Sequence, residues 1–176
     1  MLECKSQFED LLICERLREV PWQWVEEDEI PQPYRQLLCH DRDMTSTLGA
    51  FHGGEVTLKV FQSKRSGSQY LREVLLSVGD KPVEYGVILM YLDHFPPDLQ
   101  ERILGEREPL GSILNTGGLP YKSSPQGNLE FSTSDFIADI FPSAGSGSLF
   151  GRYNALLDSD GRFLARILEI LPCENQ

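Results

Sequence analysis

Apolar and polar residues alternate along the chain in two periods, and these predict its elements. A period of two, typical of strands with one buried face, favours five strands at residues 55–62, 70–78, 82–92, 149–157 and 162–171. Short polar turns join the first three segments, and Asp158-Ser159-Asp160-Gly161 joins the last two. Consecutive strands joined by tight turns predict an antiparallel meander and a C-terminal hairpin.

A helical period predicts four further segments. They are residues 1–20, residues 34–51 after Pro33, and two short helices at residues 96–104 and 109–114. Residues 21–31 are acidic and interrupted by Trp and Pro, and residues 115–128 are rich in Gly, Pro, Ser and Asn, so both are predicted to be loops. The two short helices and this second loop, residues 96–128, are a candidate mobile cover over a site.

Two ionisable side chains interrupt apolar strand faces and are the first candidates for function. Arg72 alternates with Val74 and Leu76, and Glu169 lies on the apolar face of the last strand. A buried charge is costly without a partner. One interpretation is that the two residues pair with each other, or with backbone, inside the core. The other is that they line a pocket for a ligand that is anionic at one end and carries a hydroxyl group at the other.

Composition and charge narrow the classes of function. A length of 176 residues predicts one domain over residues 1–176. The formal net charge of −11 argues against a nucleic-acid partner, because phosphate binding requires a basic surface. The 4 cysteines and 3 histidines are scattered, without the spacing of a metal site or a catalytic triad, so no metal is expected.

Neither a signal peptide nor a membrane span is predicted. Met1 is followed by Leu2-Glu3-Cys4-Lys5 without an apolar segment, and no apolar run approaches the roughly 18 residues of a transmembrane helix. We therefore expect a cytoplasmic protein with free thiols and no membrane partner. Because no sustained heptad pattern is present, we expect a monomer.

Ordered motifs over residues 33–172 resemble the chorismate lyase family, in particular its short cyanobacterial-type members. The motifs are Asp41-Arg42-Asp43-Met44-Thr45, Leu71-Arg72-Glu73-Val74-Leu75-Leu76, Pro82 with Gly86, Pro109-Leu110-Gly111, Gly151-Arg152 and Leu168-Glu169-Ile170-Leu171-Pro172. Each motif is short, and their order carries the resemblance. It implies an α+β fold with an antiparallel β-sheet, helices packed on one face, and helical flaps over a buried pocket.

The resemblance also implies an activity and a set of site residues. The family cleaves chorismate to 4-hydroxybenzoate and pyruvate without a metal or organic cofactor, and the product would serve quinone biosynthesis, here plastoquinone. Arg72 would hold the ring carboxylate, which a guanidinium suits. Glu169 would meet the 4-hydroxyl group, either as the general base or only to orient it. Met44 and Leu110 would form apolar walls, and backbone near Gly86 would approach the ligand.

One departure from the family and one competing function stay open. Better-known enterobacterial members carry an arginine where this chain has Val87, so a second cation would have to be Lys59, Arg152 or a helix N-terminus. The competing interpretation is a non-catalytic domain that binds a small molecule such as an aromatic acid, related to the effector-sensing domains of transcription regulators. The acidic N-terminal residues lack a basic recognition helix, so we expect the lyase. A catalytically silent relative is the third interpretation.

Overall fold

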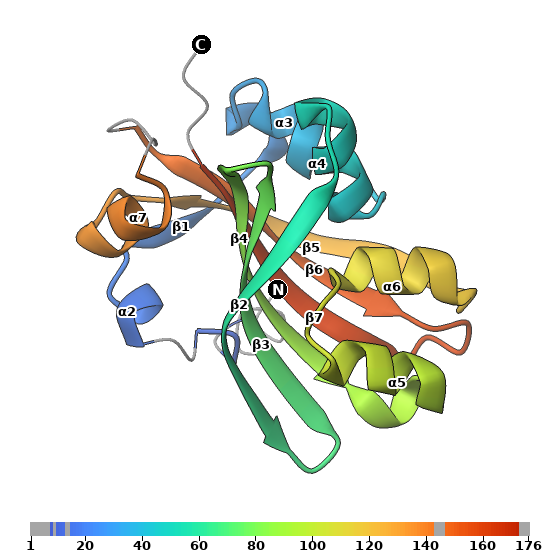
Figure 1. The fold of residues 1–176 in the computed structure, drawn as a ribbon. Coiled ribbons are helices and arrows are strands. Elements are labelled where there is room, and N and C mark those ends of the chain that lie inside the picture. Colours follow the sequence, from blue (N-terminus) through green and yellow to red (C-terminus); the bar gives the residue numbers. More distant parts are fainter. Residues whose placement is uncertain (1–7, 9, 13–14, 143–146, 173–176) are drawn as a thin grey trace.

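The computed structural model of the chain describes residues 8, 10–12, 15–142 and 147–172. Its centre is a seven-stranded antiparallel sheet in the order β1-β5-β6-β7-β4-β3-β2 (Figure 1). The strands are β1 (Trp22–Val25), β2 (Val56–Ser66), β3 (Gln69–Val78), β4 (Lys81–Tyr91), β5 (Lys122–Phe131), β6 (Leu149–Leu157) and β7 (Phe163–Leu171).

Helices cover both faces of this sheet unequally. The larger group lies on one face (Figure 1) and consists of α3 (Tyr34–Leu38), α4 (Met44–His52), α5 (Pro97–Leu104) and α6 (Leu110–Gly117). The other face carries the short helices α2 (Glu15–Arg18) and α7 (Asp135–Ile140). Two 3-10 helices, η1 (Glu27–Glu29) and η2 (Leu92–His94), follow β1 and β4. The predicted α+β class with an antiparallel sheet is confirmed, and the short helices on the second face are an addition to it.

The central strand β4 is apolar on both sides because core lies above and below it. Tyr85 and Val87 pack with Phe136 of α7. Ile88 and Met90 pack beneath α5 and α6. This alternation places Val87 on the face opposite to α4, α5 and α6, as its position in the strand predicts.

The five predicted strands are present as β2, β3, β4, β6 and β7. The turn between β6 and β7 shows why the hairpin forms there. The Asp158 carboxylate accepts hydrogen bonds from the backbone N–H groups of Asp160 and Arg162, each at 2.9 Å. Gly161 has a φ of 81°, which a residue without a side chain adopts freely. The turn chemistry therefore fixes the register of the hairpin.

Two segments predicted as loops are strands instead. Residues 21–31 contain β1, whose Trp22 and Trp24 pack against the core on the α7 side. Residues 115–128 contain the end of α6 and most of β5. The first, polar part of β5 pairs with β6 alone and is largely exposed or half-buried, whereas residues 128–131 pair with both β1 and β6. Pro125 lies at a register shift in the pairing with β6, a position that tolerates proline.

The predicted helices are also revised in part. Residues 34–51 form two helices, α3 and α4, because Asp43 caps a new start by accepting a hydrogen bond from the Ser46 N–H at 2.7 Å. Of the helix predicted over residues 1–20, the structure describes α2, and residues 1–7, 9, 13 and 14 lie outside the described residues. The helix α7 was not predicted. Its start is capped by Ser134, which accepts from the Ile137 N–H at 3.2 Å.

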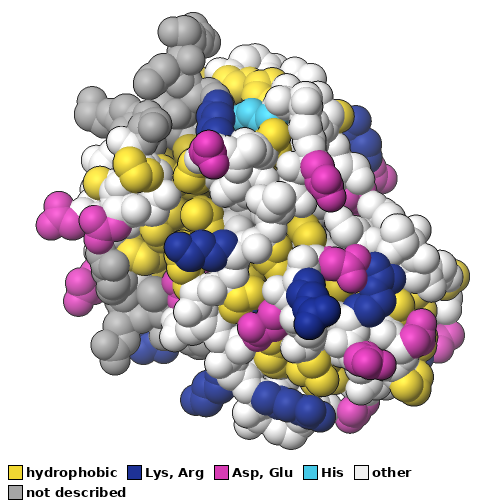
Figure 2. All heavy atoms as spheres, viewed as in Figure 1, with side chains coloured by type: hydrophobic (Ala, Val, Ile, Leu, Met, Phe, Trp, Pro, Cys, Tyr) yellow, Lys and Arg dark blue, Asp and Glu magenta, His cyan; other side chains and the backbone are white. Residues whose placement is uncertain are grey.

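Surface charge on the visible face is mixed. Figure 2 shows Lys and Arg side chains scattered among Asp and Glu rather than gathered in a stripe. With the net charge of −11, this face offers no basic surface for a phosphate backbone. Within the part of the chain that the structure describes, no helix has the length and apolar character to cross a membrane.

Candidate ligand-binding pocket

The two charged residues predicted from the sequence, Arg72 and Glu169, lie in two adjacent rows of paired residues on the sheet face beneath α4 and α6. One row consists of directly paired residues from four neighbouring strands: Arg72, Ile88, Ile167 and Asn154. The next row consists of Val74, Gly86, Glu169 and Arg152. Residues in one row lie on the same face because side chains alternate with a period of two.

A cavity lies between these rows and the helices α4 and α6. The space between the atoms that line it is about 520 Å³, a figure that counts open solvent as well as the interior. Polar side chains on its sheet side are Arg72, Glu84, Arg152, Asn154 and Glu169. Its apolar lining includes Met44 of α4, Leu110 and Leu114 of α6, and Val74, Ile88 and Ile167 of the sheet. The cavity thus combines an apolar middle with a few polar groups.

Arg72 is a buried cation for which the described part of the chain supplies no hydrogen-bond partner. Its exposed fraction is 0%, and none of its Nε, Nη1 and Nη2 atoms has a partner among the described residues. Burial lowers the pKa of the guanidinium, whereas the Tyr70 hydroxyl and the Glu106 carboxylate raise it. An unpaired charge in the interior costs several kcal/mol even after relaxation. The side chain is therefore poised to receive an anion from the cavity.

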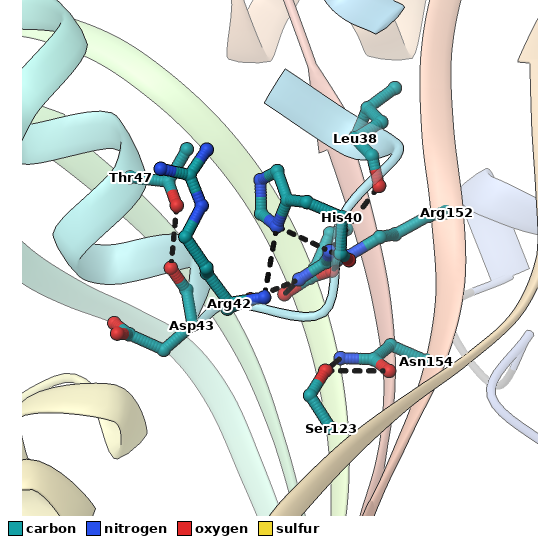
Figure 3. A network of polar contacts seen from close by, with 9 residues as sticks. Leu38, His40, Arg42, Asp43, Thr47, Ser123, Arg152 and Asn154 are labelled. Atoms are coloured by element: carbon teal, nitrogen blue, oxygen red, sulfur yellow. Dashed lines mark hydrogen bonds and ion pairs between the residues drawn. The ribbon is translucent and has the colours of Figure 1, made fainter. Parts of the chain in front are cut away.

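Glu169 is paired with Arg152, not with Arg72. The Arg152 Nε donates to the Glu169 Oε2, and its Nη2 donates to the Glu169 Oε1 at 3.4 Å. The rest of the Arg152 guanidinium donates to backbone carbonyls, among them that of His40 at 2.8 Å and that of Leu38 at 3.3 Å (Figure 3). The pair therefore joins the cavity to the segment between α3 and α4. The interpretation that Arg72 and Glu169 neutralise each other in the core is wrong.

Glu84 is a third ionisable group at the cavity. It is 3% exposed, and its Oε2 has no hydrogen-bond partner among the described residues. Burial raises the pKa of this carboxyl well above its usual range, the nearby Glu169 carboxylate raises it further, and Arg152 opposes them. The surroundings of Glu84 therefore favour the protonated form of this carboxyl group.

Four of the five predicted site residues meet at the cavity: Met44, Arg72, Leu110 and Glu169. Gly86 is not among its lining residues. A Cβ at Gly86 would lie 3.1 Å from the Val74 Cγ2 and 3.2 Å from the Glu84 Oε1. The glycine therefore makes room for these two side chains, and the expected approach of its backbone to a ligand does not follow from the structure.

The same sequence signal that singled out Arg72 could have found Glu84, which was missed, and also supports Arg152, which was named only as one alternative for a second cation. Glu84 alternates with Gly86 and Ile88 on an apolar face of β4, and Arg152 alternates with Leu156 on β6. Both are charged side chains on faces that are otherwise buried. What the sequence does not reveal is which of the buried charges pair, because pairing depends on register between strands far apart in the chain.

The three alternatives for a second cation differ in whether they line the cavity and in whether they already have a partner. The Lys59 ammonium lies 5.3 Å from the centre of the Phe61 ring, and Lys59 is not among the residues lining the cavity. Arg152 lines the cavity but is already paired with Glu169. The N-terminus of α6 also borders it, through Pro109 and Gly111. The only lining guanidinium without a partner among the described residues is that of Arg72.

The helix α6 lines one side of the cavity through Leu110, Gly111 and Leu114. Its Gly111 packs closely on the start of α4, since a Cβ there would lie 2.7 Å from the Thr45 Oγ1 and 3.0 Å from the Asp43 Oδ1. Residues 122–128 of the predicted cover belong to the sheet instead, as part of β5. The candidate cover is therefore confined to residues 97–117, which contain α5 and α6.

Metal binding finds no support in the described part of the chain. None of its His, Cys, Asp and Glu side chains gather in a group of three or more that could hold a metal ion. Burial, Arg152 and Arg42 lower the pKa of His40, which keeps this imidazole neutral beside the Arg152 guanidinium. Its Nδ1 accepts a hydrogen bond from the Arg42 N–H at 3.2 Å.

Comparison with known proteins identifies similar folds only. No protein-family model and no curated protein matches the chain. The structure of PhnF from Mycobacterium smegmatis is similar, with a TM-score of 0.57 and 10% identity over 74% of this chain and 63% of PhnF. The effector domain of PhnF gives 0.56 and 11% over 74% of this chain and 88% of that domain. A GntR-family transcriptional regulator from Bacillus cereus gives 0.50 and 15%, over 70% and 97% of the two chains. This chain therefore spans less than two thirds of full-length PhnF.

These likenesses correct the predicted enzyme. Two of these similar structures are named as an effector domain and a transcriptional regulator, and none of the three is named as a lyase. The prediction that the chain is a chorismate lyase is therefore wrong on this comparison, and the competing interpretation of a non-enzymatic ligand-binding domain agrees with it better. At 10% to 15% identity, the likeness itself shows the fold alone.

Proposed function

We propose that the chain, as one domain over residues 1–176, binds a small carboxylic acid without converting it, as an effector-sensing domain does. Arg72 anchors the carboxylate, and Met44 and Leu110 contact the body of the ligand from the helical side. Glu169 lies at the polar end away from Arg72. The body of the ligand is apolar and of ring size, as in benzoate.

The buried guanidinium of Arg72 carries this proposal. All three of its nitrogen atoms lack partners among the described residues, although the side chain is fully buried and lines the cavity. A carboxylate matches a guanidinium with two parallel hydrogen bonds. Binding would remove the cost of the unpaired charge, so the carboxylate contributes more affinity here than at an exposed arginine.

The distance between the two polar ends fits a ligand with one ring. Glu169 lies two strands away from Arg72 and one row further along the sheet. Strand spacing and rise then place their Cα atoms on the order of 12 Å apart. The long side chains of Arg72 and Glu169 reduce this gap to the span of a benzoate-sized molecule. The lining between them includes Val74, Ile88 and Ile167, which suit its apolar body.

Calorimetry with benzoate and benzamide tests the proposal. The two probes have nearly the same shape, but only benzoate carries a charge for Arg72. We expect benzoate to bind the wild-type protein far more tightly than benzamide, and Arg72→Met to weaken benzoate by about a hundredfold or more. Arg162→Met is the matched control, because the Arg162 side chain is 58% exposed in the β6–β7 turn. Equal binding of the two probes, or unchanged benzoate affinity in a folded Arg72→Met protein, would contradict the proposal.

A further inference from the structure

We propose that the Glu84 carboxyl group contacts the bound ligand as a hydrogen-bond donor, so that the ligand carries a hydrogen-bond acceptor at the end opposite its carboxylate. This inference rests on the proposed function and narrows the class of ligand. It adds a specificity-determining residue that the comparison of folds does not provide.

The position of Glu84 makes it the counterpart of Arg72 across the cavity. Glu84 pairs with Leu76, which lies four residues beyond Arg72 on β3. At a strand rise of about 3.4 Å, this separates the Cα atoms of Arg72 and Glu84 by on the order of 14 Å. Both residues line the cavity. A ligand held by its carboxylate at Arg72 therefore directs its far end toward Glu84.

Glu84 also has the unsatisfied oxygen at this end of the cavity. Both oxygens of Glu169 already accept hydrogen bonds from Arg152. The Oε2 of Glu84 has no partner among the described residues, although the side chain is only 3% exposed. A buried polar atom without a partner is uncommon and costly. A ligand atom in the cavity would satisfy it.

The charges around Glu84 favour its neutral form, which donates a hydrogen bond. From β7 it faces the Glu169 carboxylate, and from β6 it faces Arg152, whose charge Glu169 already balances. Its β3 neighbour is the apolar Leu76, and the residues at the start of α4 that line the same cavity are Asp43, Met44 and Thr45, of which the Asp43 carboxylate caps the helix. A second carboxylate here would be buried beside Glu169 without a cation of its own, so Glu84 retains its proton. A carboxyl group kept neutral in this way donates a hydrogen bond, and its ligand partner is an acceptor such as a carbonyl oxygen.

A matched pair of probes tests this inference by calorimetry. In 4-isopropenylbenzoate, a CH₂ group replaces the carbonyl oxygen of 4-acetylbenzoate, and the shape is otherwise the same. We expect the wild-type protein to prefer 4-acetylbenzoate by roughly three- to tenfold, the effect of one neutral hydrogen bond. Glu84→Leu should abolish the preference, and Glu84→Gln should retain it because its amide also donates. Loss of the preference in Glu84→Gln, or tighter binding of 4-(aminomethyl)benzoate to the wild-type protein, would overturn the inference in favour of an ionised Glu84 that binds a cation.

The outcomes separate the inference from the function on which it rests. If both matched probes bind with equal affinity and their binding depends on Arg72, the proposed function holds and the role of Glu84 fails. If neither probe binds, the proposed function fails. A measurement without ligand adds a second test: in ¹³C-glutamate-labelled protein, the carboxyl signal that Glu84→Gln removes should be that of a protonated carboxyl at pH 7. An ionised signal would overturn the inference.

Discussion

Replacing Arg72 with methionine should separate binding from stability, because the two depend on this side chain in opposite ways. Its guanidinium is fully buried and has no hydrogen-bond partner among the described residues. In the free protein it therefore carries the cost of desolvation without a compensating pair. Methionine has a similar length, and the neighbouring Val74 and Ile88 are apolar. We expect Arg72→Met to bind benzoate about a hundredfold or more weakly and yet to be more stable than the wild-type protein.

The magnitude follows from measured replacements of buried charges by apolar residues, which are neutral to stabilising by about 1–4 kcal/mol. We expect Arg72→Met to raise the free energy of unfolding by about 1–3 kcal/mol. In a protein of this size each kcal/mol shifts the melting temperature by about 2–4 °C. Arg152→Met is the contrasting variant, since it removes the partner of Glu169 and three donors to backbone carbonyls. It should lose about 3–5 kcal/mol, because a buried carboxylate is left unpaired.

Urea unfolding followed by circular dichroism measures both variants under the same conditions. Equal slopes of free energy against urea concentration would show that the comparison is of native-state stability. The reasoning is refuted if Arg72→Met is destabilised as strongly as Arg152→Met. Such a result would mean that Arg72 has partners in the free protein, and the argument for an incoming anion would lose its basis.

Three further predictions concern Glu84 and the cover. The pKa of Glu84 is raised in the folded state. The stability of the wild-type protein relative to Glu84→Gln should therefore fall as pH rises above about 4.5, where the carboxyl of the unfolded chain loses its proton. In urea unfolding at a series of pH values, parallel plots of stability against pH for the two proteins would show that the Glu84 pKa is unperturbed. Saturating benzoate should slow hydrogen exchange in α5 and α6, and protection confined to the sheet would rule out a cover. Gly111→Ala should cost about 1–3 kcal/mol and weaken benzoate, since its Cβ would lie 2.7 Å from the Thr45 Oγ1, whereas Gly53→Ala, with no atom within 4 Å but a φ of 71°, should destabilise without changing affinity.

The meander and the hairpin could be predicted from the sequence because their signals are local. Alternation over β3 and the Asp158 turn each depend on residues close together in the chain. The strand β5 could not be predicted in this way. Its residues from Lys122 to Asn128 are polar and include Pro125, and they form a strand because β6 supplies a partner along their length, whereas β1 pairs only with residues 128–131. Propensity here is overridden by tertiary pairing.

The site could be predicted in its parts but not in its connections. Alternation alone placed Arg72 and Glu169 on buried faces, and the structure brings both to one cavity with Met44 and Leu110. The pairing of β6 with β7 determines that Glu169 forms its ion pair with Arg152. Arg72 is then left without a partner among the described residues. The resemblance to a lyase family extended to the fold and the lining residues, while the comparison of structures corrected the activity.

A crystal structure of the protein grown with 4-acetylbenzoate tests the central claim most directly. The account predicts that the ligand carboxylate lies between the sheet and α6, with two oxygen–nitrogen distances of about 2.7–2.9 Å to the Arg72 guanidinium. The ring should lie over Ile88, and the acetyl oxygen should face Glu84. A ligand bound elsewhere on the protein, or one inside the cavity with its carboxylate away from Arg72, would contradict the account.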